Sequence, residues 1–493
     1  MITGSVHTRP EMAAFCTELA IMDEGRARNG LDLKSGRGRI ILDVTATPTT
    51  PPSVRAELFG PERRATTVGL VLLISLVAFE AMGVGTAMPA LVADLGAVTL
   101  YSWPFVTFLA ASVLATVLGG RWSDRSGPRA PILLGTLLFG VGLLVAGTAT
   151  GMAQLLVGRV LQGLGAGSLA VATFVLIAAV YPERLRPPVF GLISSAWVLP
   201  SLLGPPVAGV VTETFSWHWV FLGLVPLVAV ALALVAPAVR YLGPAAERQA
   251  ARRGTAPAAV GAAVGVAALS WAGQHPDAVG AVVAVVALLV LAPSLRVLLP
   301  RGVFRAGRGI PTVVASRGLL AGTFFTVNAY LPLMLHDTHG WSLAAAGLPL
   351  VAGSLCWSAA SWWQGRHPDL PRARLLRIGF VAVGIGAAGM LLVAPTWGIG
   401  WLAVPFWMVA GLGMGLGFSA VAYLVLAQSP AGTVGFNSAA AQMADQLSVA
   451  TMVGAGGALL ALLGAPAVAL PVLIAAVVAL AAYGVVTAGR AAA

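Results

Sequence analysis

The sequence predicts an all-α integral membrane protein with fourteen transmembrane helices. Of its 493 residues, only 10% are charged and 58% are hydrophobic, and the mean hydropathy is +0.90. Soluble globular chains usually carry about 25% charged residues. Uncharged stretches of about 20 residues, enough to cross the hydrocarbon core of a bilayer, recur along the chain. These observations exclude an ordinary soluble protein.

The apolar runs, divided by glycine, proline and charged residues, predict where each helix lies. Each run is long enough to cross about 30 Å of hydrocarbon. We expect helices at residues 67–91, 103–119, 130–149, 153–180, 189–211, 218–239, 258–274, 278–299, 310–335, 343–364, 375–394, 398–427, 437–463 and 466–488.

The basic residues predict the orientation of these helices. Of the 29 Lys and Arg residues, 27 lie in the N-terminal tail, in loops on one side of the spans or at the C-terminus, whereas Arg159 and Arg317 lie inside helices. Short basic loops remain in the cytoplasm. We therefore expect a multi-pass plasma-membrane protein with both termini cytoplasmic. The net charge of +11 does not indicate nucleic-acid binding, because the arginines alternate with apolar spans and form no single solvated face.

The first 66 residues differ from the rest of the chain. They hold nine basic and eight acidic residues, and the stretch TATPTTPPS at residues 45–53 has the composition of a disordered linker. We expect residues 1–66 to form a disordered cytoplasmic extension. This extension is either a regulatory tail or a dispensable segment. The second case includes the possibility that translation starts at a codon after the first methionine.

An internal repeat predicts the domain organisation. Residues 120–124 and 365–369 share the pattern G-R-x-x-D, and residues 163–167 and 411–415 share G-L-G-x-G. The two offsets, 245 and 248 residues, agree closely and relate helices 2 and 4 to helices 10 and 12. We therefore expect two six-helix bundles, at residues 67–239 and 310–493, joined by a linker at 240–309 that contains two extra transmembrane helices.

Two stretches in the first bundle resemble signatures of the major facilitator superfamily. GRWSDRSGPR at residues 120–129 resembles the signature between helices 2 and 3, although Trp122 and Pro128 depart from it. LLVGRVLQGLGAG at residues 155–167 resembles the helix-4 signature around an arginine, here Arg159. The resemblance implies two parallel six-helix halves that alternate access to a central site.

Three further stretches resemble the fourteen-helix drug:proton antiporters of that superfamily. WVLPSLLGPPVAG at residues 197–209 is similar to the helix-5 antiporter motif, with Gly204, Pro205 and Gly209 matching. Glu80 stands nine residues before Pro89, as an aspartate does in that branch, and SWHWVF at residues 216–221 resembles W-R-W-x-F with histidine in place of arginine. The resemblance implies proton-driven efflux of drug-like compounds.

Glu80 and Arg159 are the expected proton-coupling residues. Both lie within the predicted membrane spans, at depths below the outer surface that differ by about 5 Å at 1.5 Å per residue. A carboxylate at mid-membrane is costly unless it faces a cavity or is neutralised. We expect Glu80 to bind and release the coupling proton, the alternative being a structural carboxyl. The resemblance implies a coupling role for Arg159, the alternative being a structural partner for Glu80.

The second bundle lacks the equivalent charges. The repeat relates Glu80 to Asn328 and Arg159 to Trp407. We therefore expect proton chemistry in the first bundle and polar or aromatic substrate contacts, such as Asn328, in the second. Arg317 and Asp445 are expected at similar depths, where they would form an ion pair of either structural or gating function.

The resemblance also implies roles for the two remaining motifs. Gly120, Asp124, Arg125, Gly127 and Arg129 would form a cytoplasmic gate, whereas the alternative is that the arginines only set topology. Gly204, Pro205 and Gly209 would bend helix 5 and limit leakage, whereas the alternative is a simple packing kink.

Other functional classes have less support. We expect no metal, because His336 and His339 lack a third supporting ligand, and no cofactor besides the coupling proton. We find no nucleophile–base set and no phosphate-binding loop, so we expect no enzyme activity. The leading function is export of small organic molecules by a monomer in the lipid bilayer. The alternatives are proton-coupled transport of one dedicated metabolite or lipid, and a transport-inactive receptor or scaffold.

Overall fold

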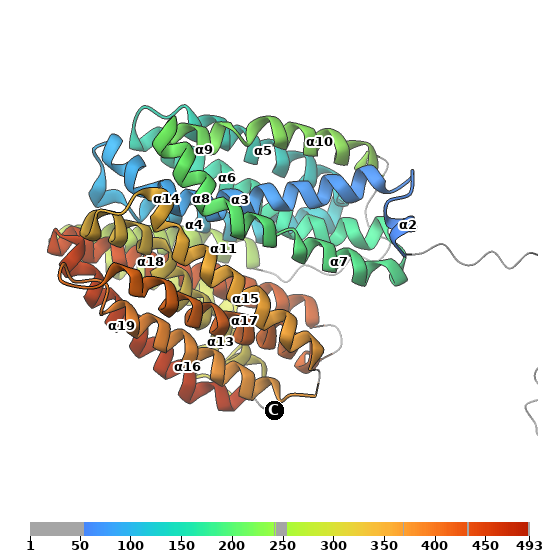
Figure 1. Cartoon of the computed structure of the whole chain (residues 1–493). Coiled ribbons are helices and arrows are strands. Elements are labelled where there is room, and N and C mark those ends of the chain that lie inside the picture. Colours follow the sequence, from blue (N-terminus) through green and yellow to red (C-terminus); the bar gives the residue numbers. More distant parts are fainter. Residues whose placement is uncertain (1–53, 241, 243–253, 368, 431–432, 492–493) are drawn as a thin grey trace, which may run out of the picture. The chain divides into compact units, whose positions relative to one another are not determined.

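The protein is described by a computed structural model that covers residues 54–240, 242, 254–367, 369–430 and 433–491. Within these residues, fourteen helices are long and apolar enough to cross a membrane. The predicted fold class and helix number are therefore confirmed. Consecutive spans run in opposite directions (Figure 1), so the loops alternate between the two ends of the helices.

The helices fall into two sets of six spans with an additional pair between them. The additional pair is α11 (Thr255–Gly273) and α12 (Ala278–Leu298). The first set is α3 (Arg64–Asp94), α4 (Trp103–Ser126), α5 (Arg129–Gly147), α6 (Met152–Val180), α7 (Arg186–Ser195) with α8 (Val198–Thr214), and α9 (His218–Leu222) with α10 (Val225–Val239). The second set is α13 (Ile310–Leu333), α14 (Leu343–Ala346) with α15 (Leu348–Arg366), α16 (Arg372–Met390), α17 (Ala403–Gln428), α18 (Val434–Leu463) and α19 (Pro466–Ala488).

We call these sets the N-terminal half and the C-terminal half. The end of the spans where α4 finishes and α5 begins carries Arg121, Arg125 and Arg129, and the matching turn between α15 and α16 carries Arg366 and Arg372. We call this the arginine-rich end, and the opposite end, where α3 finishes and α4 begins, the arginine-poor end.

The two halves repeat the same close helix packing. A Cβ atom at Gly163 of α6 would lie 2.2 Å from the carbonyl oxygen of Phe108 in α4, and one at Gly411 of α17 would lie 2.1 Å from that of Gly353 in α15. Phe108 and Gly353 are 245 residues apart, the offset of the sequence repeat. The repeated glycines therefore allow the fourth helix of each half to approach the second at backbone distance.

The fifth span is interrupted, but not where its glycine–proline motif predicts a bend. Pro205 and Pro206 lie within α8, whereas α7 and α8 separate at Ala196 and Trp197. Pro200 explains this position, because proline has no backbone N–H to donate to the carbonyl four residues earlier, that of Ala196, and its ring clashes with that carbonyl. The freed carbonyl of Ala196 instead accepts a hydrogen bond of 3.0 Å from the Ser75 hydroxyl of α3.

Most boundaries differ from the sequence prediction by a few residues, and two larger differences concern the polar segments beside α3 and α4. Residues Gly120–Asp124, expected in a loop, form the last turns of α4, which ends only at Gly127 with a φ of 81°. Polar residues can continue a helix beyond the hydrocarbon, and glycine then allows the positive φ that ends it. Disorder was expected up to residue 66, but residues 54–66 are partly helical. Helix α2 (Val54–Leu58) packs beside the start of α3, where the Leu58 carbonyl accepts a 2.9 Å hydrogen bond from the Thr67 hydroxyl. The rest of the extension, including residues 45–53, lies outside the described residues.

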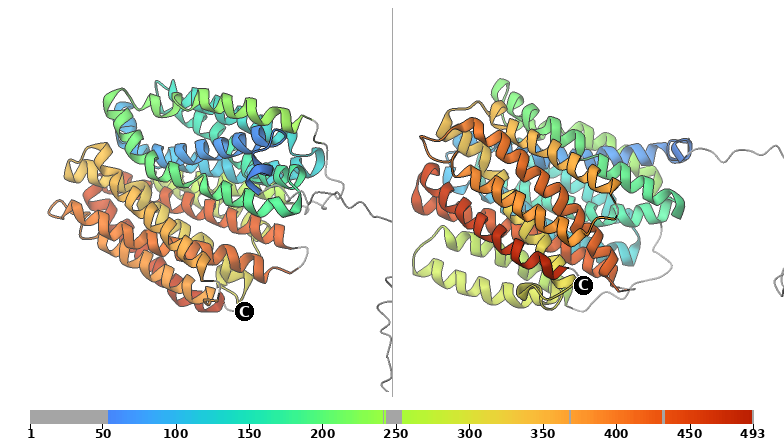
Figure 2. Two further views of the ribbon diagram at one scale, coloured as in Figure 1. Left: turned by 45° about the vertical axis from the view of Figure 1, so that its right-hand side comes forward. Right: turned by 60° about the horizontal axis from the view of Figure 1, so that its bottom comes forward.

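The inserted hairpin α11–α12 lies along one side of the two halves. Helix α11 packs against both α4 and α18, and Val106, Val266 and Leu447 from these three helices belong to one buried apolar cluster. Figure 2 shows the hairpin, in yellow-green, beside the red helices of the C-terminal half. The insertion therefore contacts both halves.

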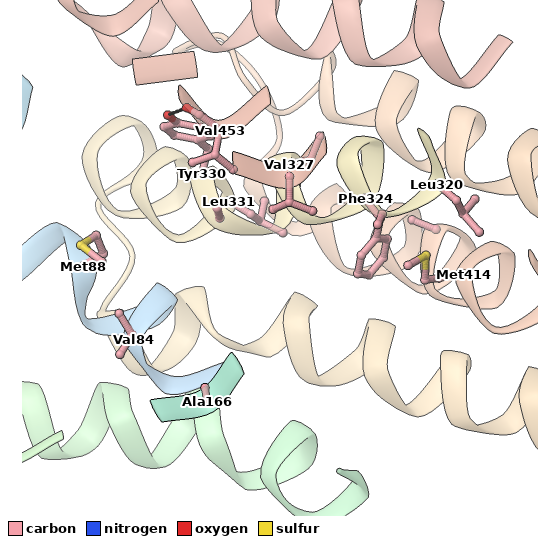
Figure 3. Packing of buried hydrophobic residues seen from close by; sticks show 14 of the residues in the cluster. Val84, Met88, Ala166, Leu320, Phe324, Val327, Tyr330, Leu331, Met414 and Val453 are labelled. Carbon is pink, nitrogen blue, oxygen red and sulfur yellow. Dashed lines mark hydrogen bonds between the residues drawn. The ribbon is translucent and has the colours of Figure 1, made fainter. Parts of the chain in front are cut away.

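A larger apolar cluster fills both halves. In the C-terminal half it includes Leu320, Phe324 and Met414, and Figure 3 shows these side chains between α13 and α17. Tyr330 lies in the same cluster, and its hydroxyl donates a 2.6 Å hydrogen bond to the carbonyl of Val453 in α18 (Figure 3). Burying Tyr330 therefore leaves its hydroxyl satisfied.

Candidate functional site

Glu80 lies on α3 in the interior of the N-terminal half. Its side chain is fully buried, and its Oε1 atom accepts a hydrogen bond from Nη1 of Arg159 in α6. The structure therefore brings together the two intramembrane charges of this half.

Arg159 is held by three further groups besides Glu80. Its Nε donates to the carbonyl oxygen of Pro104 at 2.9 Å, and its Nη1 donates to Oε1 of Gln162, one turn along α6. The guanidinium also lies over the ring of Phe108, 4.5 Å from the ring centroid. Several partners thus satisfy a cation that is only 2% exposed.

The Glu80–Arg159 pair is incompletely satisfied. The second carboxylate oxygen of Glu80 and the amide nitrogen of Gln162 are buried without a hydrogen-bond partner among the described residues. A buried ion pair recovers its desolvation cost only when its remaining polar atoms are also bonded. A carboxylate with one free oxygen is well suited to accept a proton, because the protonated carboxyl has a smaller desolvation cost.

The C-terminal half holds a neutral pair at the matched position. Nε1 of Trp407 in α17 donates a 3.1 Å hydrogen bond to Oδ1 of Asn328 in α13. The indole of Trp407 is 1% exposed and stacks on Phe324, with ring centroids 4.8 Å apart. The repeat therefore preserves the contact between first and fourth helices while its chemistry changes from ionic to neutral.

Arg317 and Asp445 form a second charged pair. Nη2 of Arg317 in α13 lies 3.3 Å from Oδ2 of Asp445 in α18 and 3.3 Å from Oε1 of Gln442. The guanidinium also lies over Phe418, 3.7 Å from the ring centroid. Both charged side chains retain some exposure, 15% for Arg317 and 12% for Asp445. This pair is thus less completely enclosed than Glu80 and Arg159.

The expected gate residues lie at the arginine-rich end, and the structure describes them only in part. Gly120, Asp124 and Arg125 belong to the last turns of α4, although the side chain of Asp124 lies outside what the structure describes. Nη1 of Arg129 donates a 3.0 Å hydrogen bond to the carbonyl of Arg240. That contact joins the start of α5 to the end of α10, both in the N-terminal half.

The helix-5 motif lies where the two halves meet. A Cβ atom at Gly209 would lie 2.5 Å from the Cα of Ala344, and one at Gly347 would lie 3.0 Å from the Cβ of Pro205. Gly204 faces α3 instead, where an added Cβ would lie 3.1 Å from the Cβ of Met82. Gly209 and Pro205 thus allow α8 to pack closely on α14 and the start of α15.

Polar contacts also join the two halves at the arginine-poor end. Oε1 of Glu213 accepts a 2.5 Å hydrogen bond from the backbone N–H of Leu343, at the first turn of α14. The hydroxyl of Tyr101 donates a 2.8 Å hydrogen bond to the carbonyl of Ala329, and its ring stacks on Tyr330 with centroids 5.2 Å apart. The described state is therefore closed at this end.

Sequence reasoning missed several of these residues, and Gln162 and Glu213 show the two reasons why. Gln162 stands three residues after Arg159, the spacing at which helical side chains meet, so the spacing was a usable signal. Glu213 is an acidic residue at the end of the fifth span, but its partner is a backbone N–H 130 residues away, which leaves no pattern in the sequence.

Comparison with known proteins identifies the family. The family model described as Major Facilitator Superfamily matches residues 70–452. The chain belongs to the Major Facilitator Superfamily. The resemblance seen in the sequence is thus confirmed, and the members of this superfamily are membrane transporters rather than enzymes.

Relatives within the Major Facilitator Superfamily include proteins named for multidrug resistance. The chain is 28% identical over 368 residues to Multidrug resistance protein 3 of Bacillus subtilis, which covers 71% of this chain and 70% of that protein. It is 31% identical over 217 residues to the Acurin A biosynthesis cluster MFS-type transporter of Aspergillus aculeatus, covering 42% of this chain and 39% of that protein. It is 28% identical over 170 residues to the multidrug efflux pump SdrM of Staphylococcus aureus, covering 34% and 38%.

Solved structures support the same fold. The crystal structure of a POT family transporter in complex with 5-aminolevulinic acid has a TM-score of 0.65 with 14% sequence identity, covering 87% of this chain and 97% of that one. At this identity the likeness concerns the fold alone.

Proposed function

We propose that this transporter is a proton-coupled antiporter that exports small organic compounds across the plasma membrane. The observation that carries the proposal is the buried Glu80–Arg159 pair, in which one carboxylate oxygen of Glu80 has no partner among the described residues. An intramembrane ionisable pair is costly to maintain, and its usual use is a proton or substrate pathway.

Protonation of Glu80 would change the balance of charge at this site. Neutral Glu80 no longer compensates Arg159, which then depends on Pro104, Gln162 and Phe108 alone. The protein would lower this cost by moving to a conformation in which Arg159 is better solvated or paired. Loss of the proton restores the ion pair and the closed state.

The conformational change would take place at the interface between the two halves. The arginine-poor end is closed by Glu213 with Leu343 and by Tyr101 with Ala329. Transport requires these contacts to break while the arginine-rich end closes, which is the rocking of two halves about a central site. We assign the gate at the arginine-rich end to Gly120, Asp124, Arg125, Gly127 and Arg129, and the seal at the opposite end to Gly204, Pro205 and Gly209.

The arginines support the proposed orientation, and the relatives support the proposed direction of transport. Basic loops favour a cytoplasmic location of the arginine-rich end, with both termini on that side. Relatives named for multidrug resistance and efflux favour export of drug-like compounds. Asn328 and the aromatic residues near it are assigned to substrate contact in the C-terminal half.

The proposal is tested in proteoliposomes with an imposed pH gradient and a panel of lipophilic compounds. Glu80→Gln is isosteric and cannot carry the proton, so we expect gradient-driven transport to be abolished while compound binding is retained. Glu62→Gln, which alters an exposed carboxylate, is the matched control and should transport normally. Undiminished gradient-driven transport by Glu80→Gln would reject proton coupling at this residue, and absence of transport by the unmodified protein for all compounds would favour a receptor or scaffold.

A second candidate function is transport of one dedicated metabolite. The observation in its favour is the similarity to a transporter named for a biosynthesis cluster. The same panel separates the two: a polyspecific exporter moves several unrelated compounds, whereas a dedicated transporter moves one chemical class.

A further inference from the structure

The fifth span of each half packs on the second span of the other half. In the N-terminal half, Gly209 of α8 meets Ala344 in the first turn of α14. The repeat offset of 248 residues relates Gly209 to Gly457 of α18. A Cβ atom at Gly457 would lie 2.6 Å from the Cβ of Ser102, at the start of α4. The two halves thus meet through two equivalent glycine contacts at the arginine-poor end.

The second of these contacts includes the inserted helix α11, which packs against both α4 and α18 (Figure 1). A Cβ atom at Gly457 would also lie 3.2 Å from Nε2 of Gln274, just past the end of α11. One turn earlier on α18, a Cβ atom at Gly454 would lie 2.8 Å from Oγ of Ser270. Helix α18 therefore packs closely on a surface that α4 and α11 make together.

Hydrogen bonds attach α11 to α4. Oε1 of Gln274 accepts a 2.8 Å hydrogen bond from Nε1 of Trp103, and Nε2 of Gln274 donates to the Ser102 hydroxyl at 3.3 Å. Both bonds are partly buried. Breaking such bonds without replacing them is costly, because the separated groups are left without partners. We therefore expect the end of α11 and the start of α4 to stay together when the halves move.

The contact between α11 and α18 differs in its chemistry. Val266 and Leu447 share a buried apolar cluster along it, and Gly454 and Gly457 bring the backbones close. The Ser270 hydroxyl lies against α18 but has no hydrogen-bond partner among the described residues. Apolar helix surfaces in a bilayer can separate because lipid tails replace the lost contacts. This contact is therefore easier to open than the one between α11 and α4.

We propose that the inserted pair α11–α12 moves with the N-terminal half, and that α11 and the start of α4 form a second seal against α18 at the arginine-poor end. Gly454 and Gly457 close this second seal in the described state, as Gly209 closes the first. Gln274 is the positioning residue that holds α11 on α4. The inference rests on the proposed opening of the arginine-poor end during transport, but not on proton coupling at Glu80.

The test measures distances between pairs of spin labels by double electron–electron resonance in the full-length protein, reconstituted in lipid nanodiscs. Cys16 and Cys356 are replaced by alanine, so that labels attach only to introduced cysteines. The three label positions are exposed at the arginine-poor end and are combined in pairs. They are Thr150→Cys in the N-terminal half, Ala278→Cys in the insertion and Ala465→Cys in the C-terminal half.

A bulky side chain in either seal should open the arginine-poor end. Gly209→Leu over-packs the first seal and Gly457→Leu the second, which destabilises the closed state. Each should raise the ratio of open to closed molecules about tenfold, measured as a longer distance between the two halves. The distance from the insertion to the C-terminal half should lengthen with it, whereas the distance from the insertion to the N-terminal half should not change.

Gly435→Leu is the matched control for the glycine variants. Gly435 also lies on α18, but an added Cβ atom there meets no neighbouring group of the described residues within 4 Å. All three distances should stay as in the unmodified protein. Every variant is first checked for a single symmetrical peak in size-exclusion chromatography, and either seal variant tests the movement of the insertion if the other does not fold.

Gln274→Leu tests the attachment of α11 to α4. The substitution removes both hydrogen bonds while keeping a side chain of similar size, so the distance between the insertion and the N-terminal half should spread over a broader range. Gln428→Leu is its control, because the amide of Gln428 donates to the carbonyl of Ala491 within the C-terminal half. That control should leave the distance between the insertion and the N-terminal half unchanged.

Three outcomes would overturn the proposal alone. The first is a longer distance between the insertion and the N-terminal half in either seal variant, since the insertion would then not move with that half. The second is opening by Gly209→Leu but not by Gly457→Leu, which leaves a single seal. The third is an unchanged distance distribution in Gln274→Leu. If neither seal variant separates the two halves, the proposed opening of this end is itself rejected, and this inference fails with it.

Discussion

The two halves of the transporter share a contact between their first and fourth helices but differ in its charge. In the N-terminal half the contact joins Glu80 to Arg159, and in the C-terminal half it joins Asn328 to Trp407. The glycines that let helices approach are also matched, at Gly163 and Gly411. Close packing is thus shared by both halves, whereas the contact is ionic in the first and neutral in the second. Under the proposed function, proton exchange belongs to the ionic contact.

The C-terminal half also contains a charged pair, but this pair differs from Glu80–Arg159 in its position and in how far it is buried. Arg317 and Asp445 connect α13 to α18 rather than to α17, and both side chains are partly exposed. Glu80 and Arg159 are almost completely enclosed. The two halves therefore divide their charges between an enclosed pair and a partly solvated one, and the following variants test that division.

The largest effect is expected from Arg159→Met. Removing the guanidinium leaves Glu80 as an uncompensated buried charge, which costs about 3–5 kcal/mol in the free energy of unfolding. The measurement is the apparent melting temperature of purified protein by differential scanning fluorimetry. Glu80→Gln combined with Arg159→Met should recover most of the loss because no charge remains, while gradient-driven transport stays absent. Equal instability of the single and double variants would show that Arg159 acts through packing.

A smaller effect is expected at Arg317 and Asp445. Replacing either residue by the opposite charge places two like charges together, at a cost of about 2–3 kcal/mol because both side chains keep some solvent contact. The double reversal Arg317→Asp with Asp445→Arg should regain part of the melting temperature. Failure of the double reversal to improve on either single variant would argue against a pairwise interaction.

The sequence anticipates part of this comparison. Fourteen apolar runs and a repeat offset are visible because hydrophobicity and close glycine packing depend on local residue type. Depth along each span also places Glu80 near Arg159 and Arg317 near Asp445. The three-residue spacing of Gln162 from Arg159 on one helix was a further usable signal. The packing that brings Pro104 to the guanidinium, and the reach of Glu213 to Leu343, depend on tertiary structure and leave no local pattern. The interruption at Ala196 and Trp197 was not predicted, because attention fell on Pro205 and Pro206 rather than on Pro200. The predicted bend at Pro205 and Pro206 stays a prediction.

The neutral pair should tolerate change better than the ionic pair. Asn328→Leu removes the acceptor of the Trp407 N–H and leaves that donor buried without a partner, which costs about 1–3 kcal/mol. Proton coupling should persist, measured as the dependence of transport on the imposed pH gradient, although the apparent affinity for compounds should fall. Loss of the gradient dependence in Asn328→Leu would contradict the assignment of proton chemistry to the N-terminal half.

The smallest effect concerns the short helical turns that precede the first span of each half. Before α3, Glu57 of α2 pairs with Arg184 at 2.5 Å, and this hydrogen bond with the guanidinium lowers the pKa of the Glu57 carboxyl. Before α13, the turn at Val303–Arg305 is instead joined to Arg490, whose Nη1 donates to the carbonyl of Arg305 at 3.4 Å. Only the first of these contacts contains a group that titrates in mild acid.

The sign of the pH effect follows from the lowered pKa. A carboxyl whose pKa is lower in the folded state stabilises that state above its unfolded value of about 4.3, and this contribution disappears as the pH falls through the lowered folded value. The melting temperature of the unmodified protein should therefore fall more between about pH 7 and pH 3 than that of Glu57→Gln. The difference should be small because the Arg184 side chain is 64% exposed, so solvent screens the pair. Arg490→Gln is the control, and it should lower stability equally at both pH values because arginine stays charged throughout. If Glu57→Gln and the unmodified protein lose the same melting temperature in acid, the Glu57–Arg184 contact is absent in solution.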